Sequence, residues 1–395
     1  MILYHTTLFG ISEQRQERSR ARADSARRRI SGWLDGHTQG PAGLVLTGPA
    51  AVAWATGGVA PPVDRTAGVD LVWAVFTPTT AALVTTNVEA PRIRAEYDPA
   101  GHGFTELAEV PWHCTDGFTE AAANLAGIAP GRLASDGHPA FGFDVCDELI
   151  SLRLALSQSE IEDLADLGHD AAHALQSALT QWRPGERDTD IQARCAALIE
   201  ASGADAPVLI VGGDDRLASY RHPMAVGAPV NRLAMAVVVA RRHGLHVALT
   251  RFVSQGPVES EYAALRTRVL AIEDAVLGAS VPGNRYGDAL TVLAVAYDAS
   301  DAIKGWNGHY QGGPIGFAQR EFEIAPVQTD SRWFTQPIET GHAIAWNPSL
   351  PGGAKAEDTY VIETDCGVRR ITDAPGWPVE DNDDRQRPAI LEVGT

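Results

Sequence analysis

The sequence predicts an α+β protein of two domains, and three observations support this prediction. The chain has 395 residues, which is more than one typical domain holds. Roughly its first 150 residues mix short strands with helices, as a small α/β domain does. The remainder alternates pairs of amphipathic helices with strands. We expect an N-terminal α/β domain at residues 1–153, a larger domain at 154–375 and an acidic tail at 376–395.

The composition narrows the possible partners and compartment. Hydrophobic residues make up 45% of the chain and charged residues 21%, as in ordinary globular proteins. The net charge of −18 disfavours nucleic acid and anionic membranes as partners, because both bind basic surfaces. No apolar run approaches the roughly 18 residues of a membrane span, and the N-terminus is too polar for a signal peptide. The four cysteines form no C-x-x-C pair, so we expect reduced thiols in a cytoplasmic protein.

The N-terminal domain begins with an arginine-rich stretch, residues 13–34. Acidic residues are interspersed there, so an exposed helix is favoured over a nucleic-acid-binding segment. Two β-rich runs around the turn at Pro78 and Thr79 predict a strand pair. The strands predicted here are 44–47, 51–55, 70–76, 81–85 and 133–135, and the helices are 89–97 and 143–152.

The larger domain begins with a helix-start signal. Ser157 and Glu160 have the S-x-x-E spacing of a capping box, in which the two side chains satisfy the first free N–H groups of a helix. The helix that follows carries apolar residues near one face until Pro184 and Gly185. The other predicted helices are 189–201, 259–277 and 286–299, and the predicted strands are 208–211, 235–240 and 245–253. Residues 305–372 are expected to be mostly strand and turn, and the tail after Pro375 to be loosely ordered.

Four polar and aromatic segments lie beside or between predicted strands in the C-terminal third. Core strands rarely carry such residues, because a buried polar group needs a partner. A cleft lined by several of these strands is the simpler explanation. The segments are Gly308 to Gly313, Arg320-Glu321, Trp346 to Pro348 and Glu357 to Thr359.

The order of elements and four short segments resemble the pita-bread superfamily of methionine aminopeptidase, prolidase, aminopeptidase P and creatinase. The resemblance covers roughly residues 157–372, and TGPAAVAWATGG resembles part of the smaller N-terminal α/β domain of creatinase and prolidase. It implies a pita-bread domain behind that smaller domain, and a homodimer. The four segments are GGDDRLASYRHP, RHGLHVALTRF, GHYQGGPIGFAQRE and WNPSLPGGAKAEDT.

Peptidases of this superfamily hold two divalent metals with two Asp, one His and two Glu. The resemblance places these five positions, in that order, on Val237, Ala248, His309, Asn347 and Glu357. One imidazole and one carboxylate are too few donors for a tight two-metal site. We therefore expect no metal and no other cofactor.

Creatinase is the family precedent for a cleft without metal. The resemblance places its catalytic His on His222, its substrate-binding Arg on Arg320 and its last Glu on Glu357. A creatinase Tyr is replaced by His246 and a creatinase Glu by Thr250, so creatine is not the expected substrate.

We expect a hydrolase that acts on a C–N bond of a small, carboxylate-bearing molecule. His222 would act as general base and then general acid, since imidazole titrates near neutral pH, and Glu357 would orient either His222 or the attacking water. Arg320, and Arg65 of a partner subunit, would hold the carboxylate. The groups expected to donate to developing negative charge are His309, His246 and Asn347. Thr250 and Tyr310 complete the expected substrate-binding set.

Several of these residues have a plainer interpretation. His222 could cap a loop, Tyr310 could be a packing residue, and Asn347 could satisfy the turn at Pro348. Arg320 could pair with Glu321 or Glu323. His169 and His173 have the spacing of a metal pair, but they lack the glutamate of H-E-x-x-H and are expected to lie on the surface.

Two other functions remain open at this point. One is a prolidase-type metallopeptidase with an altered ligand set, holding one metal on His309 and Glu357. The other is a pseudoenzyme that binds a peptide or small ligand without turning it over. Elemental analysis distinguishes the first, and recovery of an unchanged ligand that raises the melting temperature distinguishes the second.

Overall fold

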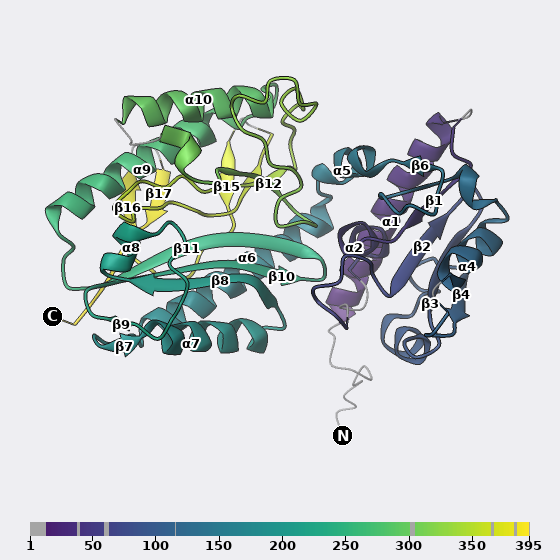
Figure 1. Cartoon of the computed structure of the whole chain (residues 1–395), viewed down its shortest axis with the longest axis horizontal. Coiled ribbons are helices and arrows are strands. Elements are labelled where there is room, and N and C mark those ends of the chain that lie inside the picture. Colours follow the sequence, from purple (N-terminus) through teal and green to yellow (C-terminus); the bar gives the residue numbers. More distant parts are fainter. Residues whose placement is uncertain are drawn as a thin grey trace. The chain divides into compact units, whose positions relative to one another are not determined.

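The computed structural model divides the chain into two compact units (Figure 1). The first comprises Met1–Glu160 with His243–Leu245, and the second comprises Ile161–Arg242 with His246–Thr395. The structure describes residues 13–37, 40–58, 63–114, 116–300, 305–364, 367–382 and 385–394.

The first unit contains one six-stranded mixed sheet with the strand order β4-β3-β2-β1-β5-β6. Neighbours β1, β2 and β3 pair antiparallel, and the outer pairs are parallel. The predicted pair at 70–76 and 81–85 is therefore confirmed. The strands are β1 (Gly43–Leu46), β2 (Val72–Phe76), β3 (Ala81–Thr86), β4 (Glu106–Val110), β5 (Leu133–Ser135) and β6 (Phe143–Asp144).

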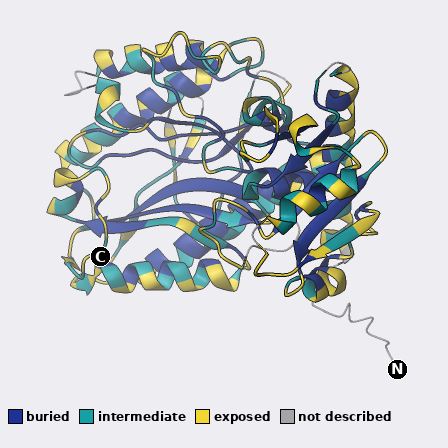
Figure 2. Ribbon diagram, turned by 45° about the vertical axis from the view of Figure 1, so that its right-hand side comes forward, coloured by how far each residue is buried: buried dark blue, intermediate teal, exposed yellow. Residues whose placement is uncertain are grey.

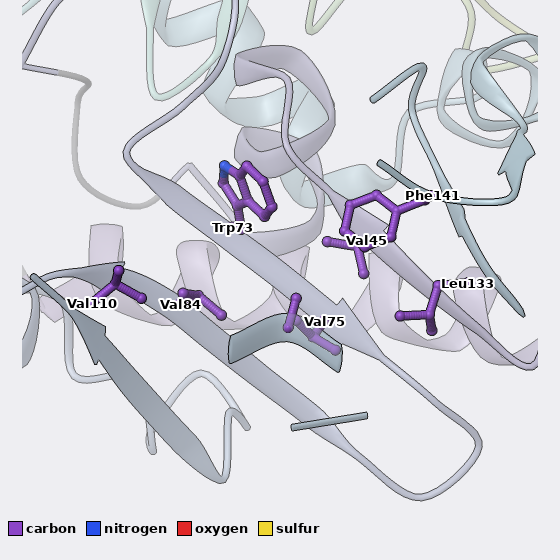
Figure 3. Close-up of a cluster of buried hydrophobic side chains, with 8 residues drawn as sticks. Val45, Trp73, Val75, Val84, Val110, Leu133 and Phe141 are labelled. Atoms are coloured by element: carbon purple, nitrogen blue, oxygen red, sulfur yellow. The ribbon is translucent and has the colours of Figure 1, made fainter. Parts of the chain in front are cut away.

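The central strands of this sheet are buried along their whole length, so helices must cover both faces. Figure 3 shows the core on one face, where Val45, Trp73, Val75 and Val84 project from neighbouring strands. Phe118 and Leu125 of helix α4 pack against this cluster. The helices are α1 (Glu13–Gly36), α2 (Pro49–Thr56), α3 (Ala90–Arg92), α4 (Gly117–Ala126) and α5 (Cys146–Leu154), with a π-helix η1 (Ile93–Tyr97) and a 3-10 turn η2 (Pro130–Arg132).

Two predictions for this unit are wrong. Residues 51–55 form helix α2 and not a strand, because Pro49 fits the first helical turn and the alanine-rich run favours helix until Gly57 (φ 72°) ends it. Helix α1 is not fully solvated, since Ala23, Ala26 and Ile30 are buried. A short apolar run does not distinguish a buried helix from a strand by its periodicity.

The second unit contains two four-stranded sheets, in the orders β18-β11-β10-β8 and β12-β13-β14-β15, and carries its helices outside them. Figure 2 shows these strands mostly buried and the helices exposed along their outer faces. The helices are α6 (Gln158–Leu179), α7 (Asp188–Ala201), α8 (Asp215–Ser219), α9 (Ser260–Ala279), α10 (Tyr286–Ala299) and the 3-10 turn η3 (Gly305–Gly308). The strands are β7 (Glu186–Arg187), β8 (Asp205–Gly213), β9 (Pro229–Val230), β10 (Leu233–Arg242), β11 (Leu245–Gln255), β12 (Gly312–Ile315), β13 (Ala343–Trp346), β14 (Tyr360–Ile362), β15 (Val368–Arg370), β16 (Val379–Asn382), β17 (Arg385–Pro388) and β18 (Leu391–Val393).

The predicted helix start at Ser157 is confirmed. The Ser157 backbone N–H donates to Glu160 Oε2 at 2.6 Å, and the Glu160 N–H approaches Ser157 Oγ at 3.4 Å. This reciprocal pair is a capping box. Among the described residues, no helix is long and apolar enough to cross a membrane.

The largest correction to the predicted fold concerns the C-terminal tail, which was expected to be loosely ordered. Strands β16 and β17 form an antiparallel hairpin, and β18 pairs in parallel with β11. Arg387 is buried between the hairpin and helix α9, where it forms ion pairs with Glu273 (2.9 Å) and Asp274. The acidic composition of residues 376–395 gave no indication that Arg387 pairs with acidic residues of α9.

Because Arg387 is buried, the C-terminal segment contributes to the stability of the second unit. Arg387→Met is expected to lower the free energy of unfolding by about 3 kcal/mol or more, because it leaves a buried carboxylate without its cation. Urea denaturation measures the change. The control is Arg385→Met on the same strand, whose partly exposed ion pair with Asp274 should contribute less than about 1 kcal/mol. Equal effects of the two substitutions would contradict the buried role of Arg387.

Candidate functional site

Glu357 is the centre of a buried polar cluster that joins three of the predicted segments. Its Oε2 accepts a hydrogen bond from Thr250 Oγ1 at 2.8 Å and lies 3.4 Å from Lys355 Nζ. Its Oε1 accepts a hydrogen bond from Asn347 Nδ2 at 3.3 Å and lies 3.5 Å from Arg320 Nη2. We call these five residues the Glu357 cluster. One carboxylate is therefore held by two cations and two neutral donors.

The strands fix this cluster. Thr250 lies in β11, Asn347 directly follows β13, and Glu357 lies three residues before β14. The Thr250 backbone N–H also donates to the Glu357 carbonyl at 2.9 Å, which ties the two segments together. Burial is nearly complete: Lys355 is 4% exposed and Glu357 3%.

The ion pair determines the charge state of the cluster. Burial by itself would raise the pKa of Glu357, but the Lys355 ammonium and the Arg320 guanidinium outweigh it and hold that pKa below its usual range. Burial lowers the pKa of Lys355, and the adjacent Glu357 opposes that shift. Glu357 is thus a carboxylate at neutral pH whose charge is already compensated within the protein.

His222 and His309 form a second group, which we call the histidine pair. His222 lies in the loop after α8, and His309 lies between η3 and β12. Their Nε2 atoms are 3.2 Å apart. His309 Nδ1 contacts the carbonyl oxygen of Tyr310, which can only accept, so His309 carries its proton on Nδ1. His309 Nε2 must then accept the bond that His222 Nε2 donates, which leaves the lone pair of His222 on Nδ1.

Both imidazoles are neutral near pH 7. Burial, followed by the charge of Lys355, lowers the pKa of His309 to about 3. The same two causes, in the same order, lower the pKa of His222 below its usual 6.5. The assigned proton positions are therefore those of two uncharged rings, and His222 Nδ1 is available as a base.

The structure brings together six of the nine residues expected at the site: His222 with His309, and Glu357 with Thr250, Asn347 and Arg320. Arg320 forms an ion pair with Glu357.

The other three expected residues lie differently. Tyr310 is 69% exposed, and its ring lies nearly parallel to His222 with 6.4 Å between centroids. His246 is buried, its Nδ1 lies 3.3 Å from the Gly316 carbonyl, and burial lowers its pKa to about 4. Its role at the site stays a prediction. Arg65 lies exposed in the first unit, and its role remains a prediction.

Lys355 is the site residue that sequence reasoning missed. A signal for it was present, since the chain has only two lysines, Lys304 and Lys355, while arginine carries almost all the positive charge. Lysine is rarely fully buried unless it is paired. The expected surface position of His169 and His173 is confirmed, since both are exposed on α6.

The residues present do not fit a two-metal centre. Val237 packs in an apolar cluster with Ile210, Leu217 and Phe252, and the buried Ala248 offers no donor atom. Glu357 has both oxygens engaged by protein groups, two of them cations. Within the described ranges, no group of three or more His, Cys, Asp or Glu side chains is arranged to hold a metal ion. A dication placed here would meet two positive charges and a single carboxylate.

Comparison with known proteins identifies a family. A model of metallopeptidase family M24 matches residues 162–364, which is just over half of the chain. A comparison with curated protein sequences finds no significant match. The family match covers both the histidine pair and the Glu357 cluster.

Solved structures show the same fold over nearly the whole chain. A dipeptidase PepE from Mycobacterium ulcerans superposes with a TM-score of 0.71 at 18% identity, over 95% of this chain and 98% of that one. An Xaa-Pro dipeptidase from Bacillus anthracis gives 0.69 at 16% identity, over 94% and 100%. An X-Pro aminopeptidase from Thermotoga maritima gives 0.70 at 17% identity, over 93% and 99%. The predicted α+β pita-bread fold with a smaller N-terminal α/β domain is confirmed.

The proton positions in the histidine pair can be tested directly. In protein labelled with ¹⁵N-histidine near pH 7, His309 should show a protonated Nδ1 and a bare Nε2, and His222 the reverse. The variants His222→Ala and His309→Ala assign the signals. A doubly protonated ring near pH 7, or a proton on Nδ1 of His222, would contradict the assigned tautomers.

Proposed function

This chain belongs to metallopeptidase family M24, and from that premise we propose that it is a hydrolase that cleaves a C–N bond of a small, carboxylate-bearing molecule without a metal centre. The observation that carries the proposal is the ion pair of Lys355 and Glu357. It places a cation of the protein itself against the one carboxylate available to a metal. Hydrolysis then depends on the histidines and on fixed positive charge.

The proposed reaction uses His222 Nδ1 as the general base. It removes a proton from a water molecule as the water oxygen attacks the carbon of the C–N bond. The resulting imidazolium returns the proton to the leaving nitrogen as that bond breaks, which restores neutral His222. His309 accepts the hydrogen bond from His222 Nε2 and so keeps the free lone pair on Nδ1.

Fixed charge supplies the rest of the catalysis in this proposal. Lys355 and Arg320 lie in a nearly dry site, where a cation stabilises developing oxyanion charge more strongly than it does in water. Asn347 donates to Glu357, while its own Oδ1 is buried without a hydrogen-bond partner among the described residues. That oxygen can accept an N–H of the substrate.

The substrate class follows from these groups. Water, an imidazole base and oxyanion stabilisation are the requirements for opening an amide or amidine carbon. Two of the similar solved structures are described as dipeptidases, and a dipeptide combines an amide bond with a free carboxylate. We expect a compact substrate of this kind, and a cytoplasmic homodimer as the family resemblance implies.

The function is tested by substitution and by chelation together. His222→Ala should lower kcat/KM about 10²- to 10⁴-fold on the dipeptide-like substrate that the native enzyme hydrolyses fastest. EDTA should leave the native rate unchanged. His169→Ala, on the exposed face of α6, is the control and should retain full activity. Activity that EDTA removes and a stoichiometric metal restores would favour an altered metallopeptidase instead.

The pH dependence of the reaction gives a second test. Since the pKa of His222 is depressed and its neutral form is the base, kcat/KM should fall only as the pH drops through a value below 6.5. Lys355→Met removes a neighbouring positive charge, so the pKa of His222 and the acid limb of the profile should both move to higher pH. Lys355→Arg keeps the charge and should keep the limb in place. A limb that is identical in all three proteins would show that Lys355 does not act on His222.

A further inference from the structure

A narrow crevice shares Lys355 with the Glu357 cluster. Arg221, which immediately precedes His222, lines one side, and Ser349 and Lys355 line another. Tyr220 and Leu217 form apolar parts of its wall. None of the sequence segments discussed above predicted a role for Arg221 or Ser349.

Arg221 is a cation without a counter-charge in the part of the chain that the structure describes. It is half-buried, its Nη1 is buried without a hydrogen-bond partner, and no described carboxylate forms an ion pair with it. Burial lowers its pKa, and the nearby Tyr297 phenol opposes that shift. A desolvated guanidinium with unused donors is costly, which indicates that it is completed by something outside the chain.

Ser349 provides a second, independent sign of a missing ligand. Ser349 is 4% exposed, and its Oγ has no hydrogen-bond partner in the described structure. It forms an isolated antiparallel β-bridge with Lys355, so the two side chains lie on the same face of that ladder. The Ser349 N–H donates to Tyr297 Oη at 2.9 Å, which fixes its backbone.

The charges of the site favour an anion. Glu357 is the one carboxylate at its centre, while Lys355, Arg320 and Arg221 are cations, and both histidines are neutral. Two of these cations, Arg221 and Lys355, line the narrow crevice. A carboxylate fits these groups, because its two oxygens match a guanidinium fork and can also accept from a hydroxyl and an ammonium.

We propose that Arg221, Ser349 and Lys355 form the subsite that binds the carboxylate of the substrate. This inference rests on the proposed function only in taking the anion to be part of the substrate. It assigns to Arg221 the role that the sequence suggested for Arg320, which is already engaged by Glu357 and by the Gln319 carbonyl. Specificity for a free carboxylate then arises within the pita-bread domain.

The subsite is tested by binding, without turnover. The probes are N-acetylglycine, which carries a carboxylate, and N-acetylglycinamide, its neutral counterpart, with dissociation constants measured by ligand-observed NMR. The native protein should bind the acid at least about ten-fold more tightly than the amide. Arg221→Gln should weaken binding of the acid about ten-fold or more and leave the amide unchanged. Ser349→Ala should weaken the acid by a smaller factor, of about three.

Matched variants make the result decisive. Arg187→Gln removes an exposed arginine that has its own partner Asp190, and it should leave binding of the acid unchanged. Arg221→Lys keeps the charge but not the fork, and should give an intermediate affinity, while thermal denaturation verifies that each variant is folded. Arg221→Gln binding the acid as the native protein does, or the amide binding as well as the acid, would overturn the subsite.

The failure of the proposed function would be seen separately. His222→Ala should bind N-acetylglycine with native affinity, since it removes the base and not the subsite. If the acid binds as expected but no dipeptide-like substrate is hydrolysed, the subsite stands and the hydrolase proposal fails.

Discussion

The ion pair between the Lys355 ammonium and the Glu357 carboxylate is the constraint on which the rest of the site depends. Two opposite charges taken out of water are stable only if they compensate each other and are hydrogen-bonded. Thr250 and Asn347 supply those hydrogen bonds, and Arg320 adds a second cation. Once these contacts are made, the carboxylate has no free oxygen to offer a metal, and the cleft is positive and not negative.

The same positive charges influence the protonation of the histidine pair. Partial burial, followed by the positive charge of Lys355, lowers the pKa of both rings. Two uncharged rings can share a single proton between their Nε2 atoms in only one direction once His309 carries its own proton on Nδ1. Arg221 adds a further positive charge near Lys355, and among the described residues its Nη1 and the Oγ of Ser349 have no hydrogen-bond partner. All of them are suited to a ligand that brings its own negative charge.

The fold was predicted correctly from the order of elements and the family resemblance. Short polar segments between strands pointed to His309, Asn347 and Glu357, whereas His222 was predicted from the resemblance to creatinase. Lys355 was missed although it is one of only two lysines, because its burial is created by strands distant in sequence. His246 was assigned to the site by its position in the family pattern, and its Nδ1 lies 3.3 Å from the Gly316 carbonyl.

Local pattern failed elsewhere for the same reason, that tertiary partners are not visible in a window of sequence. The charged C-terminal segment was expected to be loosely ordered, but Arg387 forms an ion pair with the buried Glu273 of α9, and β18 pairs with β11.

The central claim is most directly tested by anomalous diffraction from crystals soaked with manganese. The account predicts no anomalous peak beside Glu357. Two strong peaks bridged by Glu357, with Lys355 displaced from it, would contradict the account.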